Sequence, residues 1–136
     1  MNNGERETFT KRERLCSARL IEDIFENGSV FYTSLFRTSW IICSSDIPSP
    51  VQVAISVPKK TFKHAVTRNL IKRRIREAYR KNKKMLYDCL VTGNTKIAFV
   101  LFFRQSVVPE YYEVEKSVIE VIGILCYAIT KVREKS

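Results

Sequence analysis

Alternating bulky and polar residues predict a first strand between residues 29 and 44. This stretch is rich in β-branched and aromatic side chains, which favour extended backbone. Phe36, Trp40 and Ile42 fall on one face, whereas Arg37 and Ser39 fall on the other. We therefore expect one face of this strand to join the core and the other to be open to solvent.

Two further apolar stretches predict two more strands. Residues 51–57 have valine or isoleucine at every second position, and Pro58 ends the stretch because it lacks the amide that a strand ladder needs. Residues 44–50 are turn-forming, so the first two strands are expected to form a hairpin. Residues 95–103 are apolar on both faces, which predicts a third strand in the centre of the sheet.

Three segments have apolar residues at helical spacing. The first covers residues 17–28, with Ser17 as its N-cap and Asn27-Gly28 at its end. A long second helix is expected from about residue 67 to Gly93-Asn94, and a third over residues 109–131. In the first helix the residues at helical spacing are Leu20, Ile21, Ile24 and Phe25. In the third, the side chains expected to face inward are Tyr112, Val118, Ile119, Ile122 and Leu125.

The resulting order is α-β-β-α-β-α. It predicts a single small α+β domain with its helices packed on a central sheet. The chain has 136 residues, 45% of them hydrophobic, which suits one modest core. We assign residues 1–14 to a polar and basic arm without fixed structure, residues 15–131 to the domain and residues 132–136 to a C-terminal tail.

The positive charge of the chain is concentrated in one segment. The formal net charge is +10, from 24 basic and 14 acidic residues. Residues 59–84 hold 12 of the basic residues and one acid, Glu77, which leaves 12 basic and 13 acidic residues elsewhere. Such an excess indicates a polyanionic partner, either nucleic acid or an anionic membrane surface.

The basic segment predicts an amphipathic helix with a cationic stripe. Ile71, Ile75 and Ala78 fall on one side of it. A solvated helix surface usually mixes acids with its lysines, and here only Glu77 does so, which favours a bound anion. The stripe consists of Arg68, Lys72, Arg76 and Arg80 at i, i+4 spacing, with Asn69 and Arg73 beside it and Lys59, Lys60 and Lys63 on the approach.

Residue types favour nucleic acid over a membrane surface. Five arginines between positions 68 and 80 suit bidentate phosphate recognition, and the apolar side of the helix is too narrow for a membrane-surface helix. Phe25, Trp40, Phe62 and Tyr79 are either core residues or surfaces on which unpaired bases stack. Together these features favour single-stranded RNA over a duplex.

Metal-dependent and nucleophilic catalysis find little support in the sequence. The four cysteines are scattered without metal-ligand spacing, and His64 is the only histidine. We expect free thiols, a reducing cytoplasmic environment and no metal held by the protein. The N-terminus is polar and no apolar stretch is long enough to span a bilayer, so neither a signal peptide nor a membrane partner is expected. A set of catalytic residues within the chain is also absent.

The segment "AVTRNLIKRRIRE", preceded by "SVPKK", resembles the arginine- and asparagine-rich signature of the bacterial ribonuclease P protein subunit. The resemblance extends over roughly residues 12–127, because "RLCSARLIEDIFENG" is similar to the family's first helix and "YEVEKSVIEVIGIL" to its last. It implies a fold shared with the second domain of a small-subunit ribosomal protein, with a left-handed βαβ crossover. It also implies a holoenzyme in which a catalytic RNA with bound Mg²⁺ removes the 5′ leader of precursor tRNA, as an endoribonuclease, with this protein as its accessory subunit.

Carried over by position, the resemblance assigns roles to individual residues. Binding to the catalytic RNA is implied for Lys59, Lys60, Lys63, Arg68, Asn69, Lys72, Arg73, Arg76 and Arg80. A cleft for the single-stranded leader is implied at Ile21, Phe25, Arg37 and Ser39. No residue of the chain is implied to be catalytic.

Two positions depart from the family pattern. Leu70 stands where arginine is frequent, which puts one RNA contact in question, and Ile21 stands at an aromatic position of the cleft. Two other hypotheses also explain the charge: a structural or ribosomal RNA-binding protein without a role in catalysis, and a double-stranded DNA binder. Neither explains the whole signature, so we expect ribonuclease P RNA and precursor tRNA, and not DNA, as partners.

Overall fold

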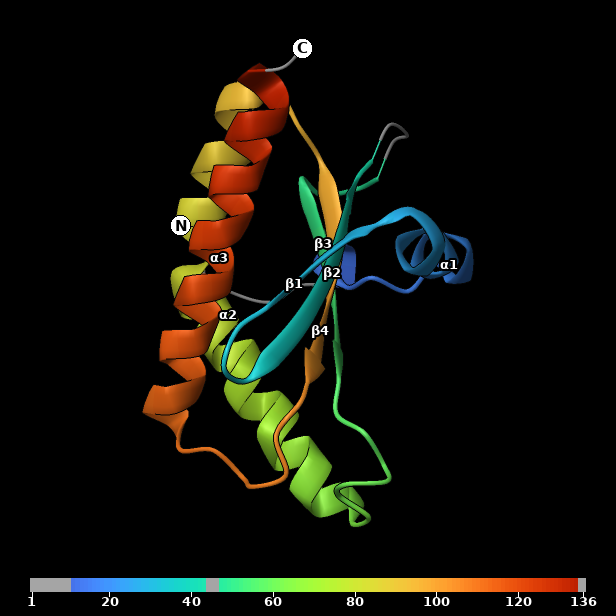
Figure 1. Cartoon of the computed structure of the whole chain (residues 1–136), viewed down its shortest axis with the longest axis vertical. Coiled ribbons are helices and arrows are strands. Elements are labelled where there is room, and N and C mark those ends of the chain that lie inside the picture. The colour runs from blue at the N-terminus through green and yellow to red at the C-terminus, as the bar shows by residue number, and fades with distance from the viewer. Residues whose placement is uncertain (1–10, 44–46, 135–136) are drawn as a thin grey trace.

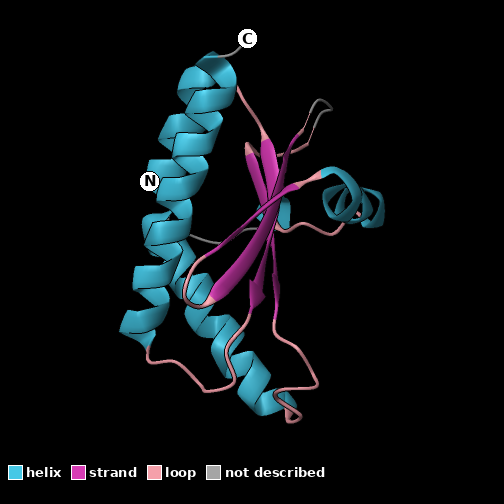
Figure 2. Ribbon diagram, in the orientation of Figure 1, coloured by secondary structure: helices cyan, strands magenta, loops and turns pink. Residues whose placement is uncertain are grey.

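A computed structural model describes residues 11–43 and 47–134 of the chain. A four-stranded sheet separates helices on its two faces (Figures 1 and 2). In chain order the elements are the short 3₁₀ helix η2 (Lys11–Glu13), α1 (Ala18–Asn27), β1 (Ser29–Tyr32), β2 (Phe36–Ile42), β3 (Val51–Ser56), α2 (Ala65–Gly93), β4 (Ile97–Phe103) and α3 (Tyr111–Glu134). The predicted α+β class is confirmed.

The sheet has the strand order β1-β2-β4-β3. β4 pairs with β2 in antiparallel and with β3 in parallel orientation, so its predicted central position is confirmed. Parallel neighbours need a crossover, and α2 provides it between β3 and β4. The left-handed sense of this crossover stays a prediction.

The predicted first strand is in fact two strands. β1 and β2 form an antiparallel hairpin, and the expected hairpin between the strands at 29–44 and 51–57 is wrong because β4 lies between β2 and β3. The turn at residues 33–35 has no glycine or proline to mark it in the sequence. Contacts from elsewhere hold it: Thr33 Oγ1 lies 3.1 Å from Ser117 Oγ of α3, and Arg104 Nη1 donates to the Thr33 carbonyl at 2.8 Å.

Helices α2 and α3 run side by side in the same direction and cover one face of the sheet (Figure 1). The predicted inward positions Val118, Ile122 and Leu125 are buried, but Tyr112 and Ile119 are exposed. The prediction was wrong there because α3 packs against α2 as well as the sheet, which rotates its buried stripe. Val114, Val121 and Ile129 complete that stripe.

Helix α1 covers part of the other face. Ser17 caps it by accepting from the Leu20 amide at 3.2 Å, and it ends at Gly28, as predicted. Ile24 packs there on Ala98 and Val100 of β4 in a second, smaller core. Helix α1 covers only part of this face of the sheet (Figure 2).

The chain before α1 is docked on the sheet. The Leu15 amide donates to the Val53 carbonyl at 3.0 Å, and the buried Glu13 carboxylate accepts from Lys83 of α2 at 2.7 Å. The predicted unstructured arm therefore includes residues 11–14 wrongly, whereas residues 1–10 lie outside the described residues. At the other end α3 continues to Glu134, past the predicted boundary at residue 131.

Candidate nucleic-acid interface

Helix α2 divides into an apolar and a cationic side, as predicted. Ile71, Ile75 and Ala78 are fully buried against the sheet and α3. Arg73 and Arg76 are exposed on the opposite side. The helix is 29 residues long, so the cationic side extends far beyond the edge of the sheet (Figure 1).

Two of the predicted RNA-binding arginines have partners within the protein. Arg68 Nη1 donates to the carbonyls of Phe62 at 2.8 Å and Lys63 at 2.9 Å. Arg80 donates to the Glu77 carboxylate at 3.0 and 2.7 Å, and this bond lowers the pKa of the Glu77 carboxyl. Arg68 therefore holds the loop before α2 in place, and Glu77 partly neutralises Arg80.

Four of the predicted residues on α2 remain available to a ligand. Asn69, Arg73 and Arg76 are exposed and Lys72 is half-buried. Within residues 11–43 and 47–134, none of the four side chains makes a hydrogen bond or an ion pair. Because unpaired cations on one helix repel one another, an anion bound across them is favourable.

Other cations of the basic segment are structural. Lys83 is buried with Glu13, and the hydroxyl of Tyr87 also donates to that carboxylate. Arg74 donates to the Pro109 carbonyl in the loop before α3. Nothing in the local sequence distinguishes these residues from their exposed neighbours, since their partners are 70 and 35 positions away along the chain.

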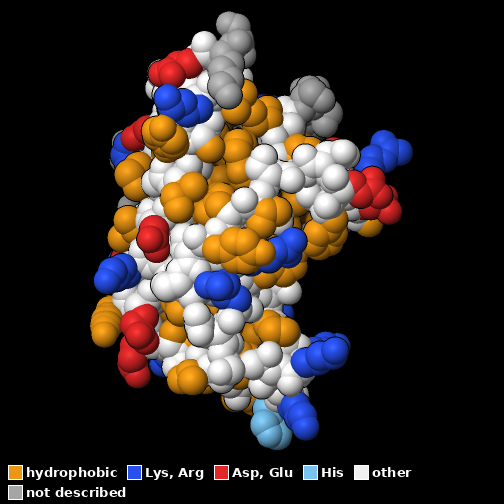
Figure 3. Space-filling model, in the orientation of Figure 1, with side chains coloured by type: hydrophobic (Ala, Val, Ile, Leu, Met, Phe, Trp, Pro, Cys, Tyr) orange, Lys and Arg blue, Asp and Glu red, His pale blue; other side chains and the backbone are white. Residues whose placement is uncertain are grey.

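The loop before α2 presents three exposed lysines, Lys59, Lys60 and Lys63. Phe62 fixes the loop, because its ring is buried and lies 5.9 Å from that of Phe103. At the start of α2, His64 makes no capping bond and the first turn has no acid, so the positive end of the helix dipole adds to the lysines. Figure 3 shows basic side chains gathered beside the histidine at this end of the molecule.

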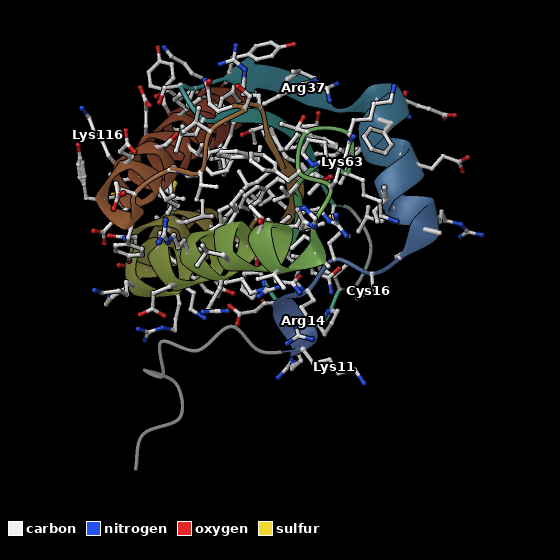
Figure 4. The ribbon with its side chains drawn as sticks, turned by 90° about the horizontal axis from the view of Figure 1, so that it is seen from below. Lys11, Arg14, Cys16, Arg37, Lys63 and Lys116 are labelled. Carbon is white, nitrogen blue, oxygen red and sulfur yellow. The ribbon has the colours of Figure 1, made fainter. Side chains whose placement is uncertain are left out.

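An aromatic platform lies on the open part of the sheet, next to α1. We define it as Phe25, Arg37 and Phe102. The Phe25 and Phe102 rings are 5.7 Å apart, and the Arg37 guanidinium lies 5.0 Å from the centre of the Phe102 ring. Phe25 is 54% exposed, so part of its ring is free to contact a base. In Figure 4, Arg37 and Lys63 lie on the same side of the molecule as α1, whereas Lys116 is on the opposite side.

The structure places the four predicted cleft residues differently. Phe25 and Arg37 lie on the platform, and Ile21 is half-buried against the smaller core beside it. Ser39 is 1% exposed, so the expectation that it faces solvent is wrong. Phe102 was missed because β4 reads as apolar on both faces, and only its pairing with Arg37 shows which face it occupies.

The remaining aromatics that were considered as platforms are core residues. Trp40, Phe62 and Tyr79 are 7%, 8% and 1% exposed, respectively. Burial raises the pKa of the Tyr79 hydroxyl well above its usual value, because the charged form is poorly solvated there. Of the four candidates, only Phe25 can stack with a ligand.

In the described part of the chain, no three His, Cys, Asp or Glu side chains come together as a metal site. The cysteines described there are free thiols. No helix in that part is long and apolar enough to cross a membrane.

A cationic helix, a lysine-rich loop and an aromatic platform thus adjoin one another in a small α+β domain. The protein-family model for ribonuclease P matches residues 9–124. The ribonuclease P protein component of Porphyromonas gingivalis (strain ATCC 33277) is 32% identical over 119 residues, which is 85% of this chain and 87% of that protein. The chain belongs to the ribonuclease P protein family. Its role is accordingly that of an RNA-binding accessory subunit in tRNA 5′ processing.

Other similarities agree with this assignment. The ribonuclease P protein component of Petrotoga mobilis is 40% identical over 79 residues, which is 58% of this chain and 64% of that protein. The structure of the Staphylococcus aureus RNase P protein superimposes with a TM-score of 0.67 at 22% identity, covering 83% of this chain and 94% of that one. For the Thermotoga maritima RNase P protein the TM-score is 0.64 at 22% identity, over 81% and 94% of the two chains. These two structures support the fold.

Proposed function

We propose that this protein holds the catalytic RNA of ribonuclease P with helix α2 and the leader of precursor tRNA on the aromatic platform. The availability of Asn69, Lys72, Arg73 and Arg76 supports the first contact. The exposed Phe25 ring beside Arg37 and Phe102 supports the second. Cationic groups attract phosphates, and aromatic rings bind unpaired bases, so the two surfaces suit the two kinds of RNA contact.

The lysine-rich loop connects the two surfaces. It follows Ser56 of β3, which pairs with Phe102 of the platform, and it leads into α2 (Figure 1). Lys59, Lys60 and Lys63 therefore lie where the phosphates of a leader would pass toward the catalytic RNA. Arg68 contributes by fixing this loop through its two carbonyl contacts, and any direct RNA contact would use its remaining donors.

Hydrolysis in this proposal is performed by the RNA subunit. The described residues do not form a site that fits Mg²⁺, so RNA phosphates would hold the ions. Asn69 is exposed, but a single amide does not make a metal site. The protein holds the substrate and the catalytic RNA together, and its positive charge offsets the repulsion between the two RNAs. We also propose that it acts in the cytoplasm, in agreement with its free cysteines.

Reconstitution tests the proposal directly. The protein is combined with bacterial ribonuclease P RNA at low Mg²⁺ concentration, and 5′ cleavage of precursor tRNA is followed. We expect the protein to increase the cleavage rate, with mature tRNA and free leader as products. RNA binding without any stimulation would instead support a structural or ribosomal RNA-binding protein.

A further inference from the structure

A row of side chains crosses all four strands on the α1 side of the sheet. The backbone register places Tyr32 opposite Arg37, Arg37 opposite Phe102, and Phe102 opposite Ser56. Directly paired residues share one face of a sheet, so these four side chains form a single line. The aromatic platform occupies only the middle of this line. Its β1 end has its own aromatic residue, Tyr32.

Tyr32 is combined there with a fixed cation. Its ring is 60% exposed, and the Arg104 guanidinium lies 5.2 Å from the ring centre. Arg104 Nη1 donates to the carbonyls of Thr33 at 2.8 Å and Ser34 at 3.4 Å, which holds the guanidinium at the β1–β2 turn. An exposed ring beside a positioned arginine combines a surface for a base with a donor for its phosphate.

We propose that Tyr32 and Arg104 form a second nucleotide subsite, which binds a base of the single-stranded leader farther from the cleavage site than the platform does. The inference rests on the proposed function of the platform. It extends the leader contact from the platform to β1. Neither the basic helix α2 nor the ribonuclease P signature in that helix implies this additional contact.

The geometry favours an unpaired strand. β1 and β4 are separated by β2, so Tyr32 and Phe102 are about 10 Å apart across the sheet. This is much longer than the step of about 3.4 Å between stacked nucleotides in a duplex strand. If neighbouring nucleotides occupy the two rings, their bases must be unstacked and the strand extended, and Arg37 then lies between the two bases, where the phosphate chain passes.

The charge of the surface beyond the β1–β2 turn limits how far the RNA contact can extend past Tyr32. Beyond the β1–β2 turn lies a surface pocket of about 530 Å³. Its charged lining residues are Glu113, Glu120 and one cation, Lys116. Its negative balance is unfavourable for RNA. At the other end of the row, the chain continues from Ser56 of β3 to Lys59 and Lys60 in the loop before α2. The surface is therefore positively charged from the row toward α2.

The test uses the reconstituted holoenzyme and precursor tRNAs whose leaders are lengthened one nucleotide at a time. We compare equilibrium affinity for the wild-type protein, Tyr32→Ala and Arg104→Gln. Wild-type affinity should increase in two steps as the leader first reaches the platform and later Tyr32. Both variants should lose only the later step, with a decrease of about five- to tenfold for long leaders, as expected when one stacked base is lost.

Tyr127 provides a matched control. It is 66% exposed and lies under Lys131, whose Nζ is 5.5 Å from the ring centre, but it is on α3 and away from the α1 face. Tyr127→Ala should leave both steps unchanged. Tyr32→Phe and Tyr32→Trp, which retain an aromatic ring, should keep the later step, so a folding defect of Tyr32→Ala can be recognised.

Three outcomes separate the inference from the proposed function. Equal losses for short and long leaders, or no loss in Tyr32→Ala, would overturn the second subsite. If Phe25→Leu removes the first step while Tyr32→Ala leaves the second, the platform stands and the extension is wrong. If the wild-type protein shows no dependence on leader length at all, both the leader contact and its extension fail.

Discussion

The two candidate RNA surfaces are built in different ways. The cationic side of α2 comes from one continuous segment, and its free side chains Lys72, Arg73 and Arg76 need only helical spacing to align. The aromatic platform combines Phe25, Arg37 and Phe102 from α1, β2 and β4, so it exists only when the sheet is assembled. Affinity at the helix should therefore depend on salt, whereas affinity at the platform should depend on packing and aromatic surface.

The largest difference is expected between two adjacent lysines of α2. Lys83 is buried in an ion pair with Glu13, whereas Lys84 pairs with Asp88 at 3.2 Å on the surface. Lys83→Ala leaves Glu13 buried without this partner, so the free energy of unfolding should fall by about 3 kcal/mol. Lys84→Ala should change it by less than about 0.5 kcal/mol. Urea unfolding of both variants measures the difference, and equal losses would show that Lys83 is not structural.

The second prediction removes the stacking surface and retains the charge. Phe102→Leu and Phe25→Leu keep apolar side chains but lose the rings, so affinity for leader-bearing precursor tRNA should fall by about 1–3 kcal/mol. The salt dependence of binding should remain as in the wild type. A mature tRNA without a leader is the control ligand, and its affinity should not change. A comparable loss for that ligand would assign the rings to another contact.

The third prediction compares two arginines that the sequence does not distinguish. Arg73→Ala should weaken binding to the catalytic RNA by about 1.5 kcal/mol, since a charged hydrogen bond is lost. It should also lower the slope of log affinity against log salt by about 1 and leave thermal stability unchanged. Arg68→Ala should additionally destabilise the protein by about 1–2 kcal/mol, because two carbonyl contacts disappear. Salt titrations together with thermal melts separate the two effects, and an undiminished Tm of Arg68→Ala would contradict the structural role.

The smallest effect concerns Glu77 and Arg80 on the surface of α2. Their hydrogen bonds lower the pKa of Glu77 below its ordinary 4.5, so the small stabilisation is present above that pH and is lost as the pH falls through the lowered value. Arg80→Gln should bring the pKa of Glu77 back toward 4.5. An NMR titration of the Glu77 carboxyl measures this change. An identical titration curve in the variant would mean that Arg80 does not pair with Glu77 in solution.

Most of the helices could be predicted from the sequence because their signals are local. Ser17 and Gly28 delimit α1, and Asn94, with a φ of 51°, adopts the left-handed conformation expected where α2 ends. The turn at residues 33–35 could not be predicted in this way. Its side-chain and carbonyl contacts come from Ser117 and Arg104, which are distant in the chain, so one continuous strand was the reasonable interpretation of residues 29–44.

The candidate site shows the same division between local and distant information. Exposed Arg73 and Arg76 follow from the apolar spacing of α2 alone. The roles of Arg74 and Lys83 do not, since their partners are 35 and 70 positions away along the chain. The partners of Arg68 are close in the chain, but only the folded loop brings the Phe62 and Lys63 carbonyls to its guanidinium. Ser39 was expected on an open face and is buried, because the sequence does not show how far α1 extends over β2.

By itself, the sequence determined which helices form, where the charge lies and which family the signature indicates, because these depend on neighbours within a few residues. Only the tertiary structure decided which cations are free and which face of β4 presents Phe102. It also placed Tyr32 and Arg104 at the end of the same row. Those properties depend on strand register and on contacts between distant segments, and a one-residue change of register would turn every side chain of a strand to the opposite face.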